Sequence, residues 1–175
     1  MMKKTIFSIS GSLRSGSSNH NILKFLSAIV PADVTYTIYN NLGQIPPFDP
    51  GLDNETPPEA VTELRNLINQ ADAVIICTPE YAFGVPGQLK NALDWLVSSS
   101  TLVDKPVSLI TASSVGNNAH ASLLLTLGAL SANVIEEAIL LIPFIRAKMD
   151  TEGNVTDKPT KESLENAFNN LLAQL

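Results

Sequence analysis

The sequence predicts a doubly wound α/β domain, in which helices cover both faces of a parallel β-sheet. Short apolar runs of strand length alternate with segments in which apolar residues recur at helical spacing. Several of the short runs are continuously apolar, which is typical of parallel strands buried on both faces. The 175 residues are 45% hydrophobic, enough for a substantial core, so we expect a single domain spanning residues 1–175.

Four short runs are predicted to be strands, and a fifth strand is expected later in the chain. The four runs lie at residues 5–9, 34–39, 73–77 and 107–111. The second run alternates β-branched and aromatic residues, whereas the third is continuously apolar. The fifth strand is expected within residues 134–142, although Glu136 and Glu137 interrupt its apolar pattern.

Five helices are predicted from apolar residues that recur every three or four positions and so share one helical face. The residues predicted to form these faces are, helix by helix, Ile22, Leu26 and Ile29; Val61, Leu64, Leu67 and Ile68; Leu89, Leu93 and Leu96; Leu123, Leu124, Leu127 and Leu130; and Leu164, Phe168, Leu171 and Leu172. The third helix is expected to begin at Pro86-Gly87 and to carry a Lys90–Asp94 ion pair. The proline-rich segment 43–58 lacks periodicity and is predicted to be an ordered loop.

Composition and charge exclude several classes of protein. Seventeen acidic against eleven basic residues give a net charge of −6, whereas binding to nucleic acid or to an anionic membrane needs clustered Lys and Arg. The single cysteine rules out an internal disulfide framework and a cysteine-rich zinc site, and we expect no metal. The longest apolar run, residues 138–145, is shorter than the roughly 20 residues of a membrane-spanning helix. We therefore expect a cytoplasmic protein.

Three loops are expected to form the functional site, because ligands of doubly wound sheets bind outside the carboxyl ends of the strands. These loops follow the first, third and fourth strands, at residues 10–19, 78–86 and 112–118. The first loop is rich in hydroxyl groups and contains one of only three arginines. Hydroxyls, a guanidinium and the N–H groups of a following helix together suit a phosphate monoester. The candidate ligands are Ser10, Ser12, Arg14, Ser17, Ser18 and Asn19.

Other interpretations of the first loop explain less of it. An N-cap at Ser17 or Ser18 would account for only part of the hydroxyl pattern. The loop has neither the GxxxxGK[ST] sequence of a P-loop nor the GxGxxG fingerprint of dinucleotide-binding folds.

Two loop motifs resemble those of the NADPH-dependent FMN reductase family, which includes quinone, azo-dye and chromate reductases. The motifs are Gly11-Ser12-Leu13-Arg14 with Ser17 and Asn19, and Pro79-Glu80-Tyr81 with Val85-Pro86-Gly87 and LKNALDW at residues 89–95. Each motif follows a predicted strand, and the resemblance covers nearly the whole chain, to an acidic turn at residues 149–157. The family has a flavodoxin-like fold, which implies a five-stranded parallel sheet of order 2-1-3-4-5.

The resemblance implies an FMN-dependent oxidoreductase that uses NADPH or NADH. The matching positions imply that Ser12, Arg14, Ser17 and Asn19 hold the FMN phosphate and that Pro79, Glu80 and Tyr81 border the isoalloxazine ring. Ala82 is expected beside the ring as well, and the third loop, with Ser113, Ser114 and Gly116, is expected to reach its pyrimidine edge. Since the flavin does the redox chemistry, no protein residue is assigned as catalytic. We expect electrons to pass to a quinone, azo, nitro or metal-oxyanion acceptor by a ping-pong mechanism, in a homodimer or homotetramer.

Two departures from the family pattern keep a second function open. Ala82 stands where the family usually has Asn, and the third loop lacks the Arg that often opens its helix. The alternative is an electron-carrying or FMN-binding protein without turnover of NAD(P)H. Aromatic residues make up only 6% of the chain, and few aromatics around a flavin leave its ring open, which favours the enzyme.

The remaining candidates are given structural roles. Cys77 is interpreted as a core residue, because no second cysteine or nearby cation activates it. His20 and His120 are expected to be exposed on helix surfaces, and Trp95 is expected to be a packing anchor. Glu80 is expected to fix its loop rather than to act as a general acid.

Overall fold

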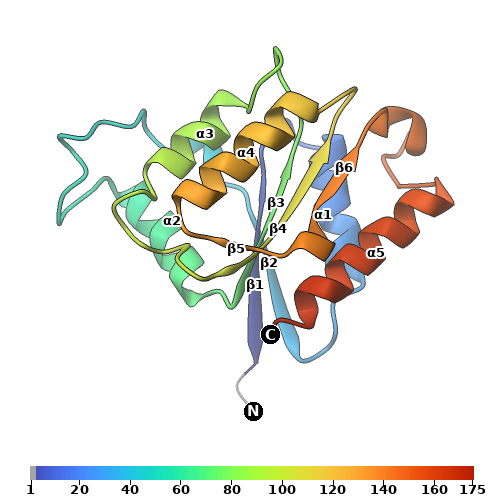
Figure 1. Cartoon of the computed structure of the whole chain (residues 1–175), viewed down its shortest axis with the longest axis horizontal. Helices are drawn as coiled ribbons and strands as arrows, with labels where there is room; N and C mark the ends of the chain where they lie inside the picture. Colours follow the sequence, from blue (N-terminus) through green and yellow to red (C-terminus); the bar gives the residue numbers. More distant parts are fainter. Residues whose placement is uncertain (1–2) are drawn as a thin grey trace.

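The structure contains one six-stranded parallel sheet with helices on both faces (Figure 1). The computed structural model describes residues 3–175; Met1 and Met2, which the predicted domain includes, lie outside the described residues. The strands are β1 (Lys4–Ser10), β2 (Val34–Tyr39), β3 (Ala73–Thr78), β4 (Pro106–Ala112), β5 (Asn133–Val134) and β6 (Leu140–Ile142). Their order is β2-β1-β3-β4-β5, with β6 also paired to β4, so the predicted order is confirmed.

The five predicted α-helices are all present. They are α1 (Ser18–Ala28), α2 (Glu59–Gln70), α3 (Gly87–Asp94), α4 (Asn117–Ala129) and α5 (Lys158–Leu172), and the short 3-10 helices are η1 (Leu42–Gln44), η2 (Glu136–Ala138) and η3 (Ile145–Lys148). Figure 1 shows α1 and α5 against one face of the sheet and α2, α3 and α4 against the other. As predicted, α3 begins at Gly87, and Lys90 Nζ lies 2.5 Å from Asp94 Oδ1.

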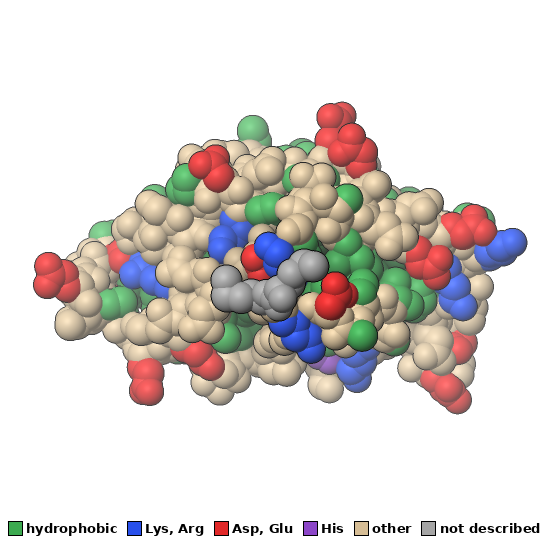
Figure 2. Space-filling view, turned by 90° about the horizontal axis from the view of Figure 1, so that it is seen from below, with side chains coloured by type: hydrophobic (Ala, Val, Ile, Leu, Met, Phe, Trp, Pro, Cys, Tyr) green, Lys and Arg blue, Asp and Glu red, His purple; other side chains and the backbone are tan. Residues whose placement is uncertain are grey.

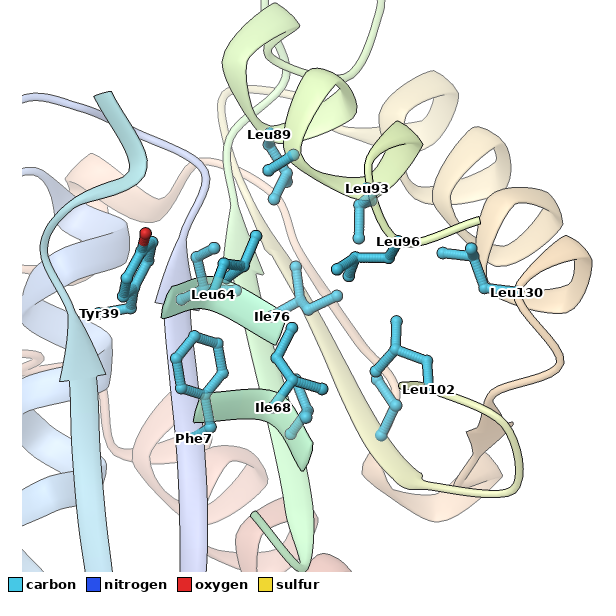
Figure 3. Packing of buried hydrophobic residues seen from close by; sticks show 14 of the residues in the cluster. Phe7, Tyr39, Leu64, Ile68, Ile76, Leu89, Leu93, Leu96, Leu102 and Leu130 are labelled. Atoms are coloured by element: carbon cyan, nitrogen blue, oxygen red, sulfur yellow. The ribbon is translucent and has the colours of Figure 1, made fainter. Parts of the chain in front are cut away.

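Each face of the sheet forms its own core. Because successive residues of a strand point to opposite faces, β1 supplies Phe7 to one core and Ile6 to the other. Figure 3 shows the first core, in which Leu93 of α3 packs over Ile76 of β3. The predicted helical faces are buried or partly buried except at Ile29, which is 38% exposed because α1 ends one residue before it.

The fifth strand is broken into two short pieces. η2 separates β5 from β6 at the position where Glu136 and Glu137 interrupt the apolar pattern. Both pieces pair with β4, and across the break Ser108 Oγ donates a hydrogen bond to the carbonyl of Ala138 at 2.7 Å. β6 therefore ends beside the carboxyl end of β4, and the chain that follows it runs next to the expected site loops.

The proline-rich loop after β2 is tied to the helices beside it. Trp95 Nε1 donates a hydrogen bond to the carbonyl of Pro46 at 2.9 Å, and the fully buried indole packs edge-to-face against Phe48. Arg65 of α2 lies 2.7 Å from Asp53, and its hydrogen bond holds the pKa of that carboxyl below the usual value. The loop is thus ordered, and Trp95 is a packing anchor, as predicted.

The end of the sheet where the strands begin carries side chains of mixed charge. Figure 2 shows this end, with Lys and Arg side chains scattered among Asp and Glu side chains. One such pair is Lys4 and Asp72, with 3.1 Å between Nζ and Oδ1. Within residues 3–175, no helix is long and apolar enough to cross a membrane.

Candidate functional site

A cavity of about 430 Å³ opens at the carboxyl ends of the strands. Its walls come from four loops, which follow β1, β3, β4 and β6. Small-molecule sites usually measure about 300–1,000 Å³, so the cavity is of the right size for a cofactor. The lining residues are Ser12, Arg14, Ser17, Ser18, Asn19, Pro79, Glu80, Tyr81, Ala112, Ser113, Ser114, Phe144, Ile145, Arg146 and Ala147. The three predicted loops therefore meet at one cavity, and a fourth loop joins them.

Most of the predicted site residues line this cavity, but Ser10, Ala82 and Gly116 do not. Ser10 is buried beneath the first loop, where its hydroxyl donates a hydrogen bond to the carbonyl of Ser12 at 3.2 Å. Gly116 is the N-cap of α4 and has a φ of 103°, a conformation that glycine adopts without strain. These two residues shape the loops instead of facing the cavity.

The loop between β1 and α1 presents hydrogen-bond donors to the cavity. Ser17 is the N-cap of α1, and its Oγ accepts a hydrogen bond from the N–H of His20 at 3.2 Å. The N–H groups of Ser18 and Asn19 have no acceptor among residues 3–175, as is usual in the first turn of a helix. Free N–H groups at a helix N-terminus favour anions.

The side chain of Asn19 fixes the start of α1 above the sheet. Its Nδ2 donates a hydrogen bond to the carbonyl of Ala112 at 3.2 Å, and its Oδ1 lies 3.4 Å from the donating Sγ of Cys77. Cys77 is fully buried, and this burial raises the pKa of its thiol. Asn19 thus ties the loop between β1 and α1 to β3 and β4, and Cys77 is a core residue, as predicted.

Gly11 allows the first loop to pass close to β3. Its N–H donates a hydrogen bond to the carbonyl of Cys77 at 2.9 Å, and a Cβ at this position would lie 2.2 Å from Thr78 Oγ1. A side chain at Gly11 would therefore push the loop away from the sheet. The next residue, Ser12, has its Oγ 3.2 Å from Tyr81 Oη, so the first and second loops touch at the cavity.

The loop after β3 makes a tight turn at residues 81–84. Tyr81 and Gly84 exchange two backbone hydrogen bonds, at 3.0 and 2.9 Å, and Ala82 and Phe83 have φ values of 48° and 59°. Positive φ at both central positions favours Asn and Gly over residues with an ordinary Cβ. Asn at position 82 would therefore suit the backbone of this turn better than Ala82, whose side chain does not line the cavity.

Ala82→Asn is expected to raise the free energy of unfolding by about 0.5–1 kcal/mol, a part of the cost of a left-handed residue with a Cβ. Urea denaturation would measure the change. The matched control is Ala28→Asn at the end of α1, where Asn is a poorer helix former than Ala and should give no gain. A lower stability for Ala82→Asn would show that the backbone of this turn does not limit stability.

Glu80 joins the second loop to the third. Its carboxylate accepts hydrogen bonds from the N–H groups of Asn118 at 2.8 Å and Ala119 at 2.9 Å, in the first turn of α4. Its own N–H donates to Ser113 Oγ at 3.1 Å. The helix N-terminus thus stabilises the negative charge, and these contacts agree with a loop-fixing role for Glu80.

The fourth wall, formed by the loop after β6, is absent from the sequence-based site. Phe144, Ile145, Arg146 and Ala147 line the cavity there. The N–H groups of Phe144 and Ile145 donate to the carbonyls of Ser114 and Ser113, both at 3.2 Å, so this segment continues beside the third loop. This loop follows the carboxyl end of a parallel strand, so the rule that predicted the other three loops applies to it as well.

The two histidines lie beside the cavity but do not line it. Both are half-buried instead of exposed as expected, and burial lowers the pKa of each, with the Lys24 charge adding to the shift of His20. His120 Nδ1 lies 2.8 Å from Thr111 Oγ1, at the end of β4. Among the described residues, no group of three or more His, Cys, Asp or Glu side chains is placed to hold a metal ion.

Comparison with known proteins gives matches along almost the whole chain. Residues 4–146 match the family model described as NADPH-dependent FMN reductase. The chain is 36% identical to a quinone reductase of Escherichia coli K12 over 170 residues, covering 93% of this chain and 90% of that protein. It is 39% identical to an NADPH azoreductase of Bacillus sp. OY1-2, over 54% of each protein. The structure of FerB, a flavoenzyme NAD(P)H:(acceptor) oxidoreductase from Paracoccus denitrificans, superposes with a TM-score of 0.81 at 26% identity, covering 98% of both chains.

Proposed function

Because the chain belongs to the NADPH-dependent FMN reductase family, we propose that it oxidises NAD(P)H and reduces a small quinone, azo, nitro or metal-oxyanion acceptor. FMN is the cofactor of such an oxidoreductase, and NAD(P)H is the co-substrate. Quinones are the acceptor class with most support, since the Escherichia coli relative is a quinone reductase. The observation that carries the proposal is the cavity at which the hydroxyl-rich loop and the Tyr81 loop meet.

The donor set of the cavity suits a flavin mononucleotide. We assign the phosphate to Ser12, Arg14, Ser17, Ser18 and Asn19, and the ring to Pro79, Glu80, Tyr81, Ser113 and Ser114. At Ser18 and Asn19 the free backbone N–H groups serve as donors, since the Asn19 side chain is already hydrogen-bonded. Held there, FMN would supply the redox chemistry, the transfer of a hydride equivalent from NAD(P)H and of two electrons to the acceptor.

The two substrates are proposed to use one opening of the cavity in turn. One side is closed by the end of β4, where Ala112 lines the cavity and is almost fully buried. The opposite side is open, since Tyr81 is 54% and Phe144 67% exposed at its edge. The phenol ring of Tyr81 offers a flat surface on which a planar molecule stacks. Substrates that share one opening exclude each other, which favours a ping-pong mechanism.

The test is anaerobic mixing of the FMN-loaded protein with NADPH, followed by addition of a quinone. NADPH alone is expected to bleach the visible flavin band, and the quinone is expected to restore it, because each substrate reacts without the other present. Steady-state double-reciprocal plots should then be parallel. Converging plots would contradict the shared opening. Failure of both NADPH and NADH to bleach the flavin would instead support the electron-carrier alternative.

Exposed apolar side chains in the site loops support assembly into a homodimer or homotetramer. Leu13 and Phe83 are 60% and 79% exposed, and Phe144 belongs to the same end of the sheet. Large exposed apolar groups gathered in one region are typical of protein–protein contacts. We propose that a second copy of the chain covers part of them. A purely monomeric species in sedimentation velocity at micromolar concentration would contradict this assembly.

A further inference from the structure

The three arginines of the chain divide into one structural residue and two cavity residues. Arg65 is fully engaged: it bonds to Asp53, to Ser98 Oγ and to the carbonyl of Trp95. Arg14 and Arg146 both line the cavity, and neither forms an ion pair within residues 3–175. In a chain of net charge −6, two arginines without an ion pair among the described residues therefore line one cavity.

The acidic side chain that lines the cavity already has hydrogen-bond partners within the protein. Glu80 is the only Asp or Glu among its lining residues. Its carboxylate accepts hydrogen bonds from the first turn of α4, at 2.8 and 2.9 Å from the N–H groups of Asn118 and Ala119. Two arginines against one glutamate leave the lining side chains with a net positive charge, to which the N-terminus of α1 adds its positive end.

The backbone of Arg146 is held in a defined place. It follows Ile145, which is buried and whose N–H donates to the carbonyl of Ser113 at 3.2 Å. η3 leads toward α5, which lies on the same face of the sheet as α1 (Figure 1). The cavity lies between the start of α1, beside Arg14, and η3, which carries Arg146.

We propose that Arg146 is a second cationic ligand of the phosphate group of the bound flavin nucleotide, acting together with Arg14. This inference rests on the proposed function. A phosphomonoester carries a charge of about −1.5 to −2 at pH 7, which one guanidinium balances only in part. Arginine also suits phosphate geometrically, because its planar fork donates two parallel hydrogen bonds.

The experiment compares the Kd values of FMN and riboflavin for the apoprotein, measured by flavin fluorescence. Arg146→Gln is expected to weaken FMN about 10- to 100-fold, the effect of losing a charge-assisted hydrogen bond, while riboflavin changes little. Arg146→Lys should retain part of the affinity, because it keeps the charge but loses the fork. The charge-matched control is Lys24→Gln on α1, an exposed residue outside this cavity, which should leave both affinities unchanged.

The outcomes separate this inference from the proposed function. If the unmodified protein binds riboflavin as tightly as FMN, the phosphate site itself is wrong. If it prefers FMN and Arg146→Gln keeps that preference, the phosphate site stands and only the role of Arg146 is overturned. Unchanged FMN affinity together with a raised KM for NADPH would also overturn it, because Arg146 would then serve the nicotinamide nucleotide. Urea unfolding of each variant checks that the fold is retained.

Discussion

Truncation of Leu93 to alanine is expected to lower the free energy of unfolding by about 2–5 kcal/mol. Leu93 lies on the inner face of α3 and is 4% exposed, within the core that also contains Ile76, Leu96 and Leu102 (Figure 3). Removing its branched end loses apolar burial and leaves a cavity that the close-packed neighbours fill only in part. Urea denaturation of the purified variant would give the change.

The matched control for this prediction is Leu125→Ala on α4. Leu125 is 78% exposed, so the same chemical change should alter the free energy of unfolding by less than about 0.5 kcal/mol. Equal effects of the two substitutions would mean that α3 does not bury the face described here.

Arg14→Ala is expected to weaken FMN binding by about 1.5–3 kcal/mol, or roughly 10- to 150-fold in Kd. Arg14 lines the cavity beside Ser12 and Ser17, and it has no acidic partner within the described chain, so its charge is available to an anion. Fluorescence titration of the apoprotein with FMN would measure the loss.

Riboflavin provides the internal control, because it has the same ring and no phosphate. Its affinity for the Arg14→Ala protein should stay close to that for the unmodified protein. An equal loss for FMN and riboflavin would show that Arg14 acts on the ring or on the fold rather than on the phosphate.

The strands and three of the site loops could be predicted because burial leaves a direct mark on the sequence. Residues 73–77 and 107–111 fall inside β3 and β4, which are covered on both faces and therefore read as apolar runs. Once strands are placed, the rule that ligands bind at their carboxyl ends places the loops as well. The first, second and third loops of the cavity follow from this rule.

The fourth wall is not predicted from the sequence, because the fifth strand is expected only broadly within residues 134–142 and its interrupted pattern does not show where it ends. β6 has only three residues, and η2 carries two glutamates directly before it. Contacts between distant segments also leave no local pattern. Nothing near Glu80 in sequence shows that its carboxylate bonds to Ala119, nor does the sequence around Asn19 show that its amide reaches Ala112.

The broken fifth strand limits how sheets of different molecules can join. An edge strand exposes a row of unpaired N–H and C=O groups, on which another chain can add as a further strand. At one edge this row is cut by η2 between the two residues of β5 and the three of β6, whereas β2 at the other edge runs for six residues. A fibre needs both edges to accept a neighbour, because each added molecule must offer a new edge to the next. Pairing through β2 alone closes after two copies, so the interruption protects the protein against open-ended aggregation.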